Sequence, residues 1–237
     1  MSTLLLRLVG PMQAWDVQSH FTFRMTGLEP SKSGVVGLLC AALGKPRDEA
    51  PGDGYPSIKE LAALKMGMRV DREGRVRRDF HTAGIAKNGI GGYLKADGKV
   101  ATENPVVSYR WYLHDAAFLV GFEGNYDLLE RLHKALANPH WMLCLGRKAC
   151  VPSEPVYLPN GLVESANLET ALAGHGRLRH KRHSDDPDVM RGLLEDDMGE
   201  IVRPDQPVSF IKGARQFGLR RMKPTMFANQ SLYKEIA

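Results

Sequence analysis

The chain is organised around residues 30–44, which read Pro-Ser-Lys-Ser-Gly-Val-Val-Gly-Leu-Leu-Cys-Ala-Ala-Leu-Gly. Their apolar side chains recur at helical spacing, and this predicts a helix that packs into the core. Ser31 or Ser33 can cap the first turn by accepting a hydrogen bond from a backbone N–H. Gly44 follows the last apolar position, where a left-handed C-cap favours glycine.

The N-terminus of this helix is a candidate anion site. Free backbone N–H groups, the helix dipole, Lys32 and Ser33 converge there, which suits a phosphate. The stretch is not a nucleotide-binding phosphate loop, because Thr26 and Ser31 stand where that motif requires glycine. Two interpretations stay open: a capped core helix, or a helix that contacts a nucleic-acid backbone.

Composition limits the class of protein. The chain has 237 residues, 43% of them hydrophobic, and a net charge of +5. Three cysteines cannot build a disulfide framework, which favours a reducing compartment. The apolar run at residues 4–9 is interrupted by Arg7 and is too short to span a membrane. We expect a cytoplasmic protein with no membrane contact.

The order of expected elements indicates an α+β fold. We expect strands at 3–9, 65–71, 75–82, 106–112, 116–121 and 143–145, with turns at 71–74 and at Asp115, and helices at 30–44 and 125–136. This predicts a ferredoxin-like (RRM-like) βαββαβ core over residues 1–150. The glycine- and lysine-rich segment 83–104 is expected to be an inserted β-hairpin thumb. Residues 151–237 are expected to form a loosely structured C-terminal extension that packs on the core.

Basic and aromatic residues recur together near predicted turns and strand ends. Cations that position phosphates and rings that stack on bases are typical of proteins that hold single-stranded RNA. On this ground Arg24, Arg77, Lys87, Lys95 and Tyr109 are candidate RNA-binding residues. Metal-free RNA cleavage needs a general acid and base, and His81 and His114 are the candidates for it. The spacing of histidines and cysteines predicts no metal site.

Four spaced motifs resemble the CasD subunits of type I-E CRISPR Cascade, in the repeat-associated RAMP superfamily. They lie at residues 10–15, 30–39, 110–118 and 145–150, in the family's order. One position departs from the family, since Asp16 stands where glycine usually follows the tryptophan of the first motif.

The resemblance implies a non-catalytic subunit without a cofactor. Such a subunit binds the 5′ handle of the crRNA, caps the CasC backbone, contacts CasA and reaches target DNA only through the complex. Carried over by position, the residues expected around the handle are Gln13, Trp15, Lys32, Ser33, His81, Arg110, Arg147 and Lys148. The alternative is a metal-independent endoribonuclease that processes CRISPR precursor RNA, as in the type I-C relative.

Overall fold

The structure is a computed structural model that describes residues 1–16, 22–50, 52–83, 93–94, 99–101, 105–178 and 188–228. It confirms a mixed α+β fold that is rich in strands. Within the described residues the main sheet has seven strands in the order β10-β1-β9-β4-β11-β13-β12, and all neighbours are antiparallel. The bounds are β1 (Ser2–Val9), β4 (Lys65–Arg72), β9 (Ala117–Gly124), β10 (Leu162–Val163), β11 (Val189–Glu195), β12 (Ile201–Ser209) and β13 (Gln216–Ala228).

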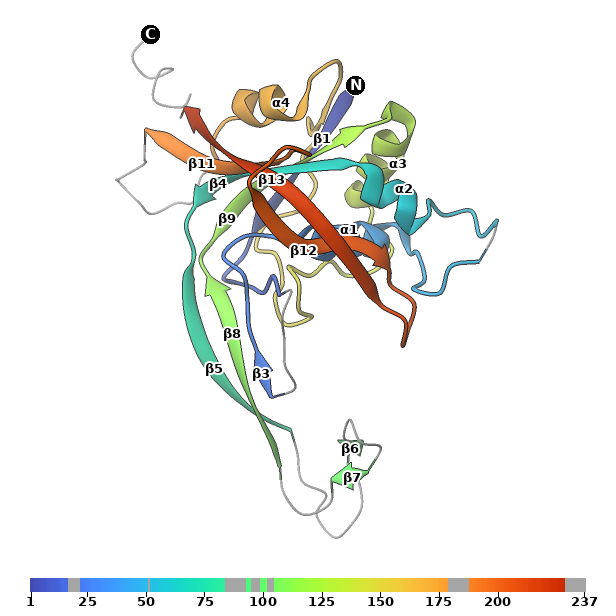
Figure 1. Ribbon diagram of the computed structural model, residues 1–237, viewed down its shortest axis with the longest axis vertical. Coiled ribbons are helices and arrows are strands. Elements are labelled where there is room, and N and C mark those ends of the chain that lie inside the picture. Colours follow the sequence, from blue (N-terminus) through green and yellow to red (C-terminus); the bar gives the residue numbers. More distant parts are fainter. Residues whose placement is uncertain are drawn as a thin grey trace.

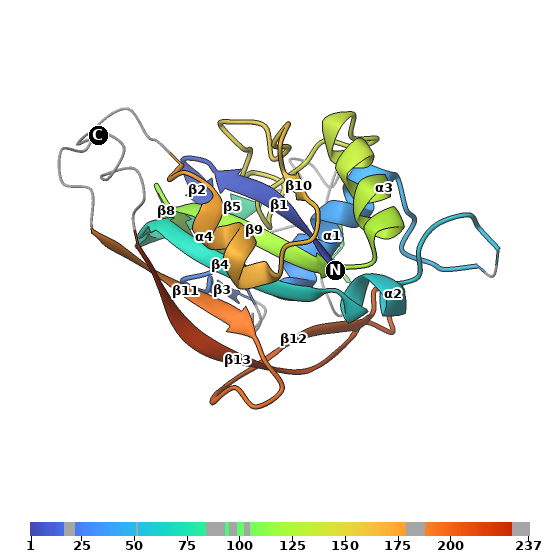
Figure 2. The same cartoon turned by 90° about the horizontal axis from the view of Figure 1, so that it is seen from above.

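Helices cover both faces of this sheet. The alternation along β1 sends Leu4 and Leu6 into a core shared with α1 (Lys32–Leu43), α2 (Ile58–Ala63) and α3 (Tyr126–Ala137). It sends Leu5 into a second core on the opposite face, under α4 (Leu168–Gly174). Figure 2 shows α4 lying across the strands and α1 and α3 beside each other.

Local signals fix the helix ends where the sequence predicts them. Ser31 accepts a hydrogen bond from Gly34 N at 3.3 Å, and Gly44 is left-handed with φ 72°. Asn125 caps α3 by accepting from Leu128 N. These caps satisfy backbone groups that a helix end leaves without partners.

A second sheet extends from the body as an arm (Figure 1). It contains β5 (Arg75–Ala83) and β8 (Val106–His114), which pair along their whole length, with β2 (Met12–Gln13) and β3 (Phe23–Arg24) on the other edge of β8. Beyond the described end of the arm, β6 (Tyr93–Leu94) and β7 (Val100–Ala101) pair with each other. The predicted thumb residues Lys87 and Lys95 lie outside the described residues.

The predicted turn at residues 71–74 does not reverse the chain, so β4 and β5 do not pair with each other. β4 and β5 follow each other almost directly and form the two halves of one long strand, and β9 and β8 form the antiparallel partner. Arg72 pairs with Ala117 in the main sheet, and Arg75 pairs with His114 in the arm. Asp115 is a bend with φ 59° between the halves, not the turn of a hairpin. An aspartate tolerates this left-handed conformation better than most residues.

Two further predictions are wrong in the C-terminal half. Residues 143–145 form no strand; β1 instead pairs with β10, through Thr3 with Val163 and Leu4 with Leu162. Residues 188–228 are not loosely structured, because they contain β11, β12 and β13 of the main sheet. Glycine and proline within these strands weaken the sequence pattern, whereas β11 is held by pairing with β4, β13 by pairing with β11, and β12 by pairing with β13.

Candidate nucleic-acid interface

The register of the arm sorts its side chains onto two faces. Successive residues of a strand point to opposite faces, and residues paired across strands share a face. Arg77 pairs with Tyr112, Asp79 with Arg110 and His81 with Ser108. On the other edge of β8, Arg24 pairs with Arg110.

We call the face that holds Arg110 the basic face. The side chains that β3, β5 and β8 place on it are Arg24, Arg75, Arg77, Asp79, His81, Ser108, Arg110, Tyr112 and His114. Arg75 and Arg77 are exposed and form no ion pair with the described residues, and Arg110 donates Nε–H to Ser108 Oγ at 3.1 Å. A strip of guanidinium groups with a single carboxylate attracts a polyanion and suits phosphate oxygens.

His81 belongs to a small cluster on the basic face. Its Nε2 lies 2.8 Å from Asp79 Oδ2 and 3.4 Å from the Tyr112 hydroxyl. The second candidate, His114, lies six residues along β8 from Ser108, the residue that pairs with His81. At about 3.3 Å per residue this separates the two histidines by about 20 Å. They cannot act as an acid–base pair on one phosphate.

The opposite face of the arm, here called the aromatic face, carries a cluster of rings. Tyr109 stacks on Phe23 at 5.7 Å between ring centroids, and the edge of Phe80 approaches at 5.8 Å. The Arg78 guanidinium lies 5.2 Å from the centroid of Tyr109. The predicted RNA-binding residue Tyr109 therefore lies on the face opposite to Arg77 and Arg110, and its partly exposed ring already contacts Phe23, Phe80 and Arg78.

Arg147 fastens the root of the arm to the body. Its Nη1 donates to Trp111 O at 2.9 Å, its Nη2 donates to Met25 O at 2.6 Å, and its guanidinium lies 5.0 Å from the Tyr112 ring centroid. The preceding Gly146 has φ 92°, and a Cβ there would meet Ala14 O at 1.8 Å. Only glycine can bring this turn so close to the first motif. Lys148 follows as an exposed side chain.

The N-terminus of α1 does bind an anion, but the anion belongs to the chain. Lys32 N–H donates to Asp205 Oδ2 at 2.9 Å, and Lys32 Nζ donates to both oxygens of Glu195 at 2.8 Å. Lys32 has no exposed surface. Burial lowers the pKa of its ammonium, although Glu195 acts in the opposite direction. The sequence located an anion site correctly, and a carboxylate from β12 fills it.

Gln13 and Trp15 are also interior residues. Gln13 Nε2 donates to Leu8 O and Ala116 O, and its Oε1 accepts from Trp15 Nε1 at 2.8 Å. Trp15 is almost completely buried against Gly34 of α1. In this conformation Gln13, Trp15 and Lys32 build the core beneath the arm and have no surface on which RNA could lie. Ser33 is partly exposed on α1.

Sequence reasoning missed Arg75 and both exposed phenylalanines of the aromatic face. The alternation of basic residues at 75 and 77 with Val76, Arg78 and Phe80 is the signal that could have separated the two faces. Within the described part of the chain no group of histidine, cysteine and acidic residues is placed to hold a metal ion. No helix among the described residues has the length and hydropathy of a membrane span.

Comparisons with known proteins agree with one another. The family described as CRISPR-associated protein (Cas_Cas5) matches residues 3–223. The CRISPR system Cascade subunit CasD of Escherichia coli (strain K12) is 32% identical over 186 residues, covering 73% of this chain and 77% of that protein.

Two solved structures are similar over nearly the whole chain. One, described as the crystal structure of a Cas protein, is 41% identical with a TM-score of 0.72 and covers 96% of each chain. The other, from a CRISPR RNA-guided surveillance complex, is 32% identical with a TM-score of 0.74 and covers 95% of this chain and 90% of that one.

Proposed function

The chain belongs to the CRISPR-associated Cas5 family, and we propose that it is a non-catalytic subunit of a type I-E CRISPR surveillance complex. In this proposal it holds the 5′ handle of the crRNA on the basic face of the arm. It caps the CasC backbone, contacts CasA and meets target DNA only through the assembled complex. The order β10-β1-β9-β4, with α1 following β1 and α3 following β9, supports a ferredoxin-like core.

One observation carries the RNA-binding proposal. The pairing of β8 with β5 and β3 aligns Arg24, Arg77 and Arg110 on one face, although they are distant in sequence. Phosphate contacts from such a strip fix the position of a strand without reading its sequence. Such phosphate contacts suit a subunit that holds an RNA segment of constant sequence.

The two neighbouring arginines of β5 allow a matched test, because Arg77 lies on the basic face and Arg78 on the aromatic face. We expect Arg77→Ala to weaken handle binding several-fold and to reduce the salt slope of log K by about 1, because one phosphate contact is lost. Arg78→Ala removes the same charge and leaves both quantities close to wild type. Fluorescence anisotropy with a labelled handle RNA over a series of salt concentrations measures both. Equal effects of the two variants would contradict the proposal.

The endoribonuclease alternative has one specific feature in its favour. His81, Asp79 and Tyr112 form a hydrogen-bonding cluster on the basic face, where an RNA phosphate would lie. Incubation of the purified chain with repeat RNA in EDTA tests this function. We expect uncut RNA; cleavage at one site that His81→Ala abolishes would replace the non-catalytic proposal by the enzymatic one.

A further inference from the structure

The strand β5 has one open edge. β8 lies in the middle of the arm sheet, with β5 on one side and the short strands β2 and β3 on the other. In the main sheet the inner half of the same long strand is flanked on both sides, by β9 and by β11. Along β5 no described strand takes the place of β11, so β5 forms the outer border of the arm (Figure 1).

The hydrogen bonds of β8 show which backbone groups of β5 face outward. Tyr109 N–H donates to Thr22 O, on the side of β3. The carbonyl of Trp111, two residues on, accepts from Arg147. Tyr109 and Trp111 thus direct their backbone groups away from β5, and in an antiparallel ladder the residues that pair with them face the opposite way. By this alternation the residues of β5 with outward N–H and C=O groups are Val76, Arg78, Phe80 and Thr82.

These outward groups are accessible to a partner. All four residues are exposed, and no backbone hydrogen bond from another described segment reaches them. One of their N–H groups has a side-chain acceptor, because Phe80 N–H donates to Asp79 Oδ1 at 2.8 Å. The Asp79 carboxylate is itself exposed, so a partner carbonyl can replace it. A charged side chain in this position hinders unwanted pairing of the free edge.

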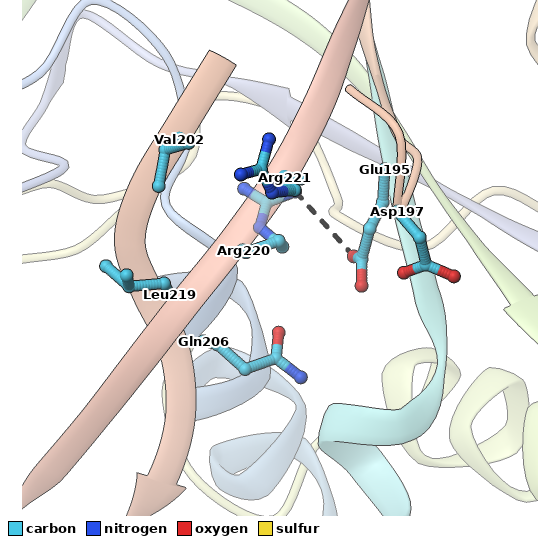
Figure 3. Close-up of a pocket in the computed structure, with 7 residues that line it drawn as sticks. All are labelled: Glu195, Asp197, Val202, Gln206, Leu219, Arg220 and Arg221. Carbon is cyan, nitrogen blue, oxygen red and sulfur yellow. Dashed lines mark ion pairs between the residues drawn. The ribbon is translucent and has the colours of Figure 1, made fainter. Parts of the chain in front are cut away.

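The edge strand of the main sheet, β12, is protected in ways that β5 is not. It contains Pro204 and Pro207, and its register with β13 shifts at two places. Figure 3 shows part of this irregular ladder, where Arg220 of β13 forms an ion pair with Glu195. Proline and irregular pairing prevent a further strand from adding to an edge. β5 contains neither proline nor glycine, and it pairs with β8 without a shift.

The backbone and side chains of β5 define the partner that fits. Alternating N–H and C=O groups along an edge are matched by another polypeptide backbone and not by a nucleic acid. Val76 and Phe80 are 43% and 58% exposed on the aromatic face, and they suit apolar side chains on a neighbouring strand. β5 carries three arginines and one aspartate. A second copy of β5 would therefore bring like charges together, whereas an acidic strand is attracted.

We infer that β5 accepts an additional strand from another protein subunit, an extended acidic segment with apolar side chains facing Val76 and Phe80. The backbone of this segment pairs with the outward groups of β5 and lies in the plane of the arm sheet. Both faces of the arm stay open, so RNA on the basic face and the added strand bind side by side. That the partner belongs to the surveillance complex rests on the proposed function.

Arg78 allows a matched test, because alanine and proline both remove its charge but only proline removes the outward N–H. Proline is tolerated at edge positions whose N–H faces solvent. The chain is titrated into a purified subcomplex of the other subunits with guide RNA, and binding is followed by biolayer interferometry. We expect Arg78→Ala to weaken binding about threefold, and Arg78→Pro to weaken it about tenfold more. Equal binding by the two variants would overturn the strand addition.

Handle RNA alone separates this inference from the proposed function. The isolated wild-type, Arg78→Ala and Arg78→Pro chains should bind the handle equally, because the substitutions leave the basic face unchanged. A chain that binds no handle RNA and still shows the difference between the two variants in assembly would contradict the proposed function and support the added strand.

Hydrogen exchange of the wild-type chain tests the inference without a substitution. The outward N–H groups of Val76, Arg78 and Thr82 should exchange fast in the isolated chain and with handle RNA, and slowly in the assembled complex. Mass spectrometry with electron-transfer fragmentation measures this. Fast exchange of these three amides in the complex would refute the added strand. Analytical ultracentrifugation should show a monomeric isolated chain, and a dimer that Arg78→Pro dissociates would assign the edge to a second copy instead.

Discussion

The role inferred for Lys32 from the sequence differs from the role that its neighbours in the structure give it. Its position at a helix N-terminus suggests contact with phosphate, yet its ammonium is enclosed by Glu195 and its N–H by Asp205. Desolvation of a buried ammonium is costly, and only paired carboxylates offset it. Lys32 therefore joins the first helix to strands that lie more than 150 residues later.

Removal of this charge should affect stability and leave RNA affinity intact. We expect Lys32→Ala to lower the free energy of unfolding by roughly 3 kcal/mol, because Glu195 loses its closest partner. Urea denaturation measures this, and handle binding is checked under conditions where the variant is folded. The double variant Lys32→Met/Glu195→Met should recover part of the loss, since no charge is then left without a partner. A Lys32→Ala protein of wild-type stability that no longer binds the handle would contradict this assignment.

At the scale of elements, the arm is the outer half of one long hairpin. Its inner half lies in the main sheet as β4 and β9, so the arm has a rigid base. Tyr112 packs into the core at the root, and Arg147 links that root to the turn at Gly146. The arm is thus positioned by contacts at its root, where Tyr112 is buried, and not by the exposed basic residues farther along it.

Arg147 and Lys148 give adjacent variants that separate positioning from direct contact. Arg147→Ala removes two hydrogen bonds to backbone carbonyls, so we expect faster hydrogen exchange in residues 22–27 and 108–114. Handle affinity should fall while its salt slope stays unchanged, in contrast to Arg77→Ala. Lys148→Ala should leave the exchange rates as they are, because its side chain is exposed. A reduced salt slope of log K for Arg147→Ala would instead indicate that the Arg147 side chain contacts a phosphate directly.

At the scale of the whole molecule, ion pairs and hydrogen bonds join the C-terminal strands to the N-terminal half. Glu29 binds Arg191 and Arg203, and Asp205 binds Arg220 as well as Lys32 N–H. Burial raises the pKa of the Asp205 carboxyl, but the hydrogen bonds and charge of Arg220 outweigh burial and hold that pKa below its usual value.

This linkage predicts how stability depends on pH. The ordinary pKa of an aspartate carboxyl is 3.8, and in the folded protein the pKa of Asp205 is lower than this. Its ionised form therefore stabilises the folded protein fully at pH values above 3.8, and this contribution is lost as the pH falls through the folded-state pKa. We expect the free energy of unfolding to fall with acidification in this range, and to fall less in Asp205→Asn. The exposed carboxylate variant Glu200→Gln should follow the wild-type curve. Urea melts from pH 6 to pH 3 measure the slopes, and identical curves for wild type and Asp205→Asn would refute the linkage.

The predictions that hold are those that depend on neighbours along the chain. The caps at Ser31 and Asn125 follow from hydrogen bonds within four residues, so the sequence locates α1 and α3 correctly. The strands expected at 65–71 and 75–82 were also located, as β4 and β5, but the expectation that the chain turns back between them was wrong. A turn-like sequence cannot show whether a chain reverses or only bends, because the distant partner strand decides this.

The sequence by itself determined the family, the capped helices α1 and α3, the stretches that become β1, β4, β5, β8 and β9, and the presence of clustered basic residues. Tertiary structure decided which of those cations face solvent together. Arg77 and Arg78 are equal in charge and adjacent in sequence, yet pairing with β8 puts them on opposite faces. Lys32 meets carboxylates from the far end of the chain and becomes a core residue. Charge and periodicity are local properties, whereas register and burial depend on contacts between residues remote in sequence.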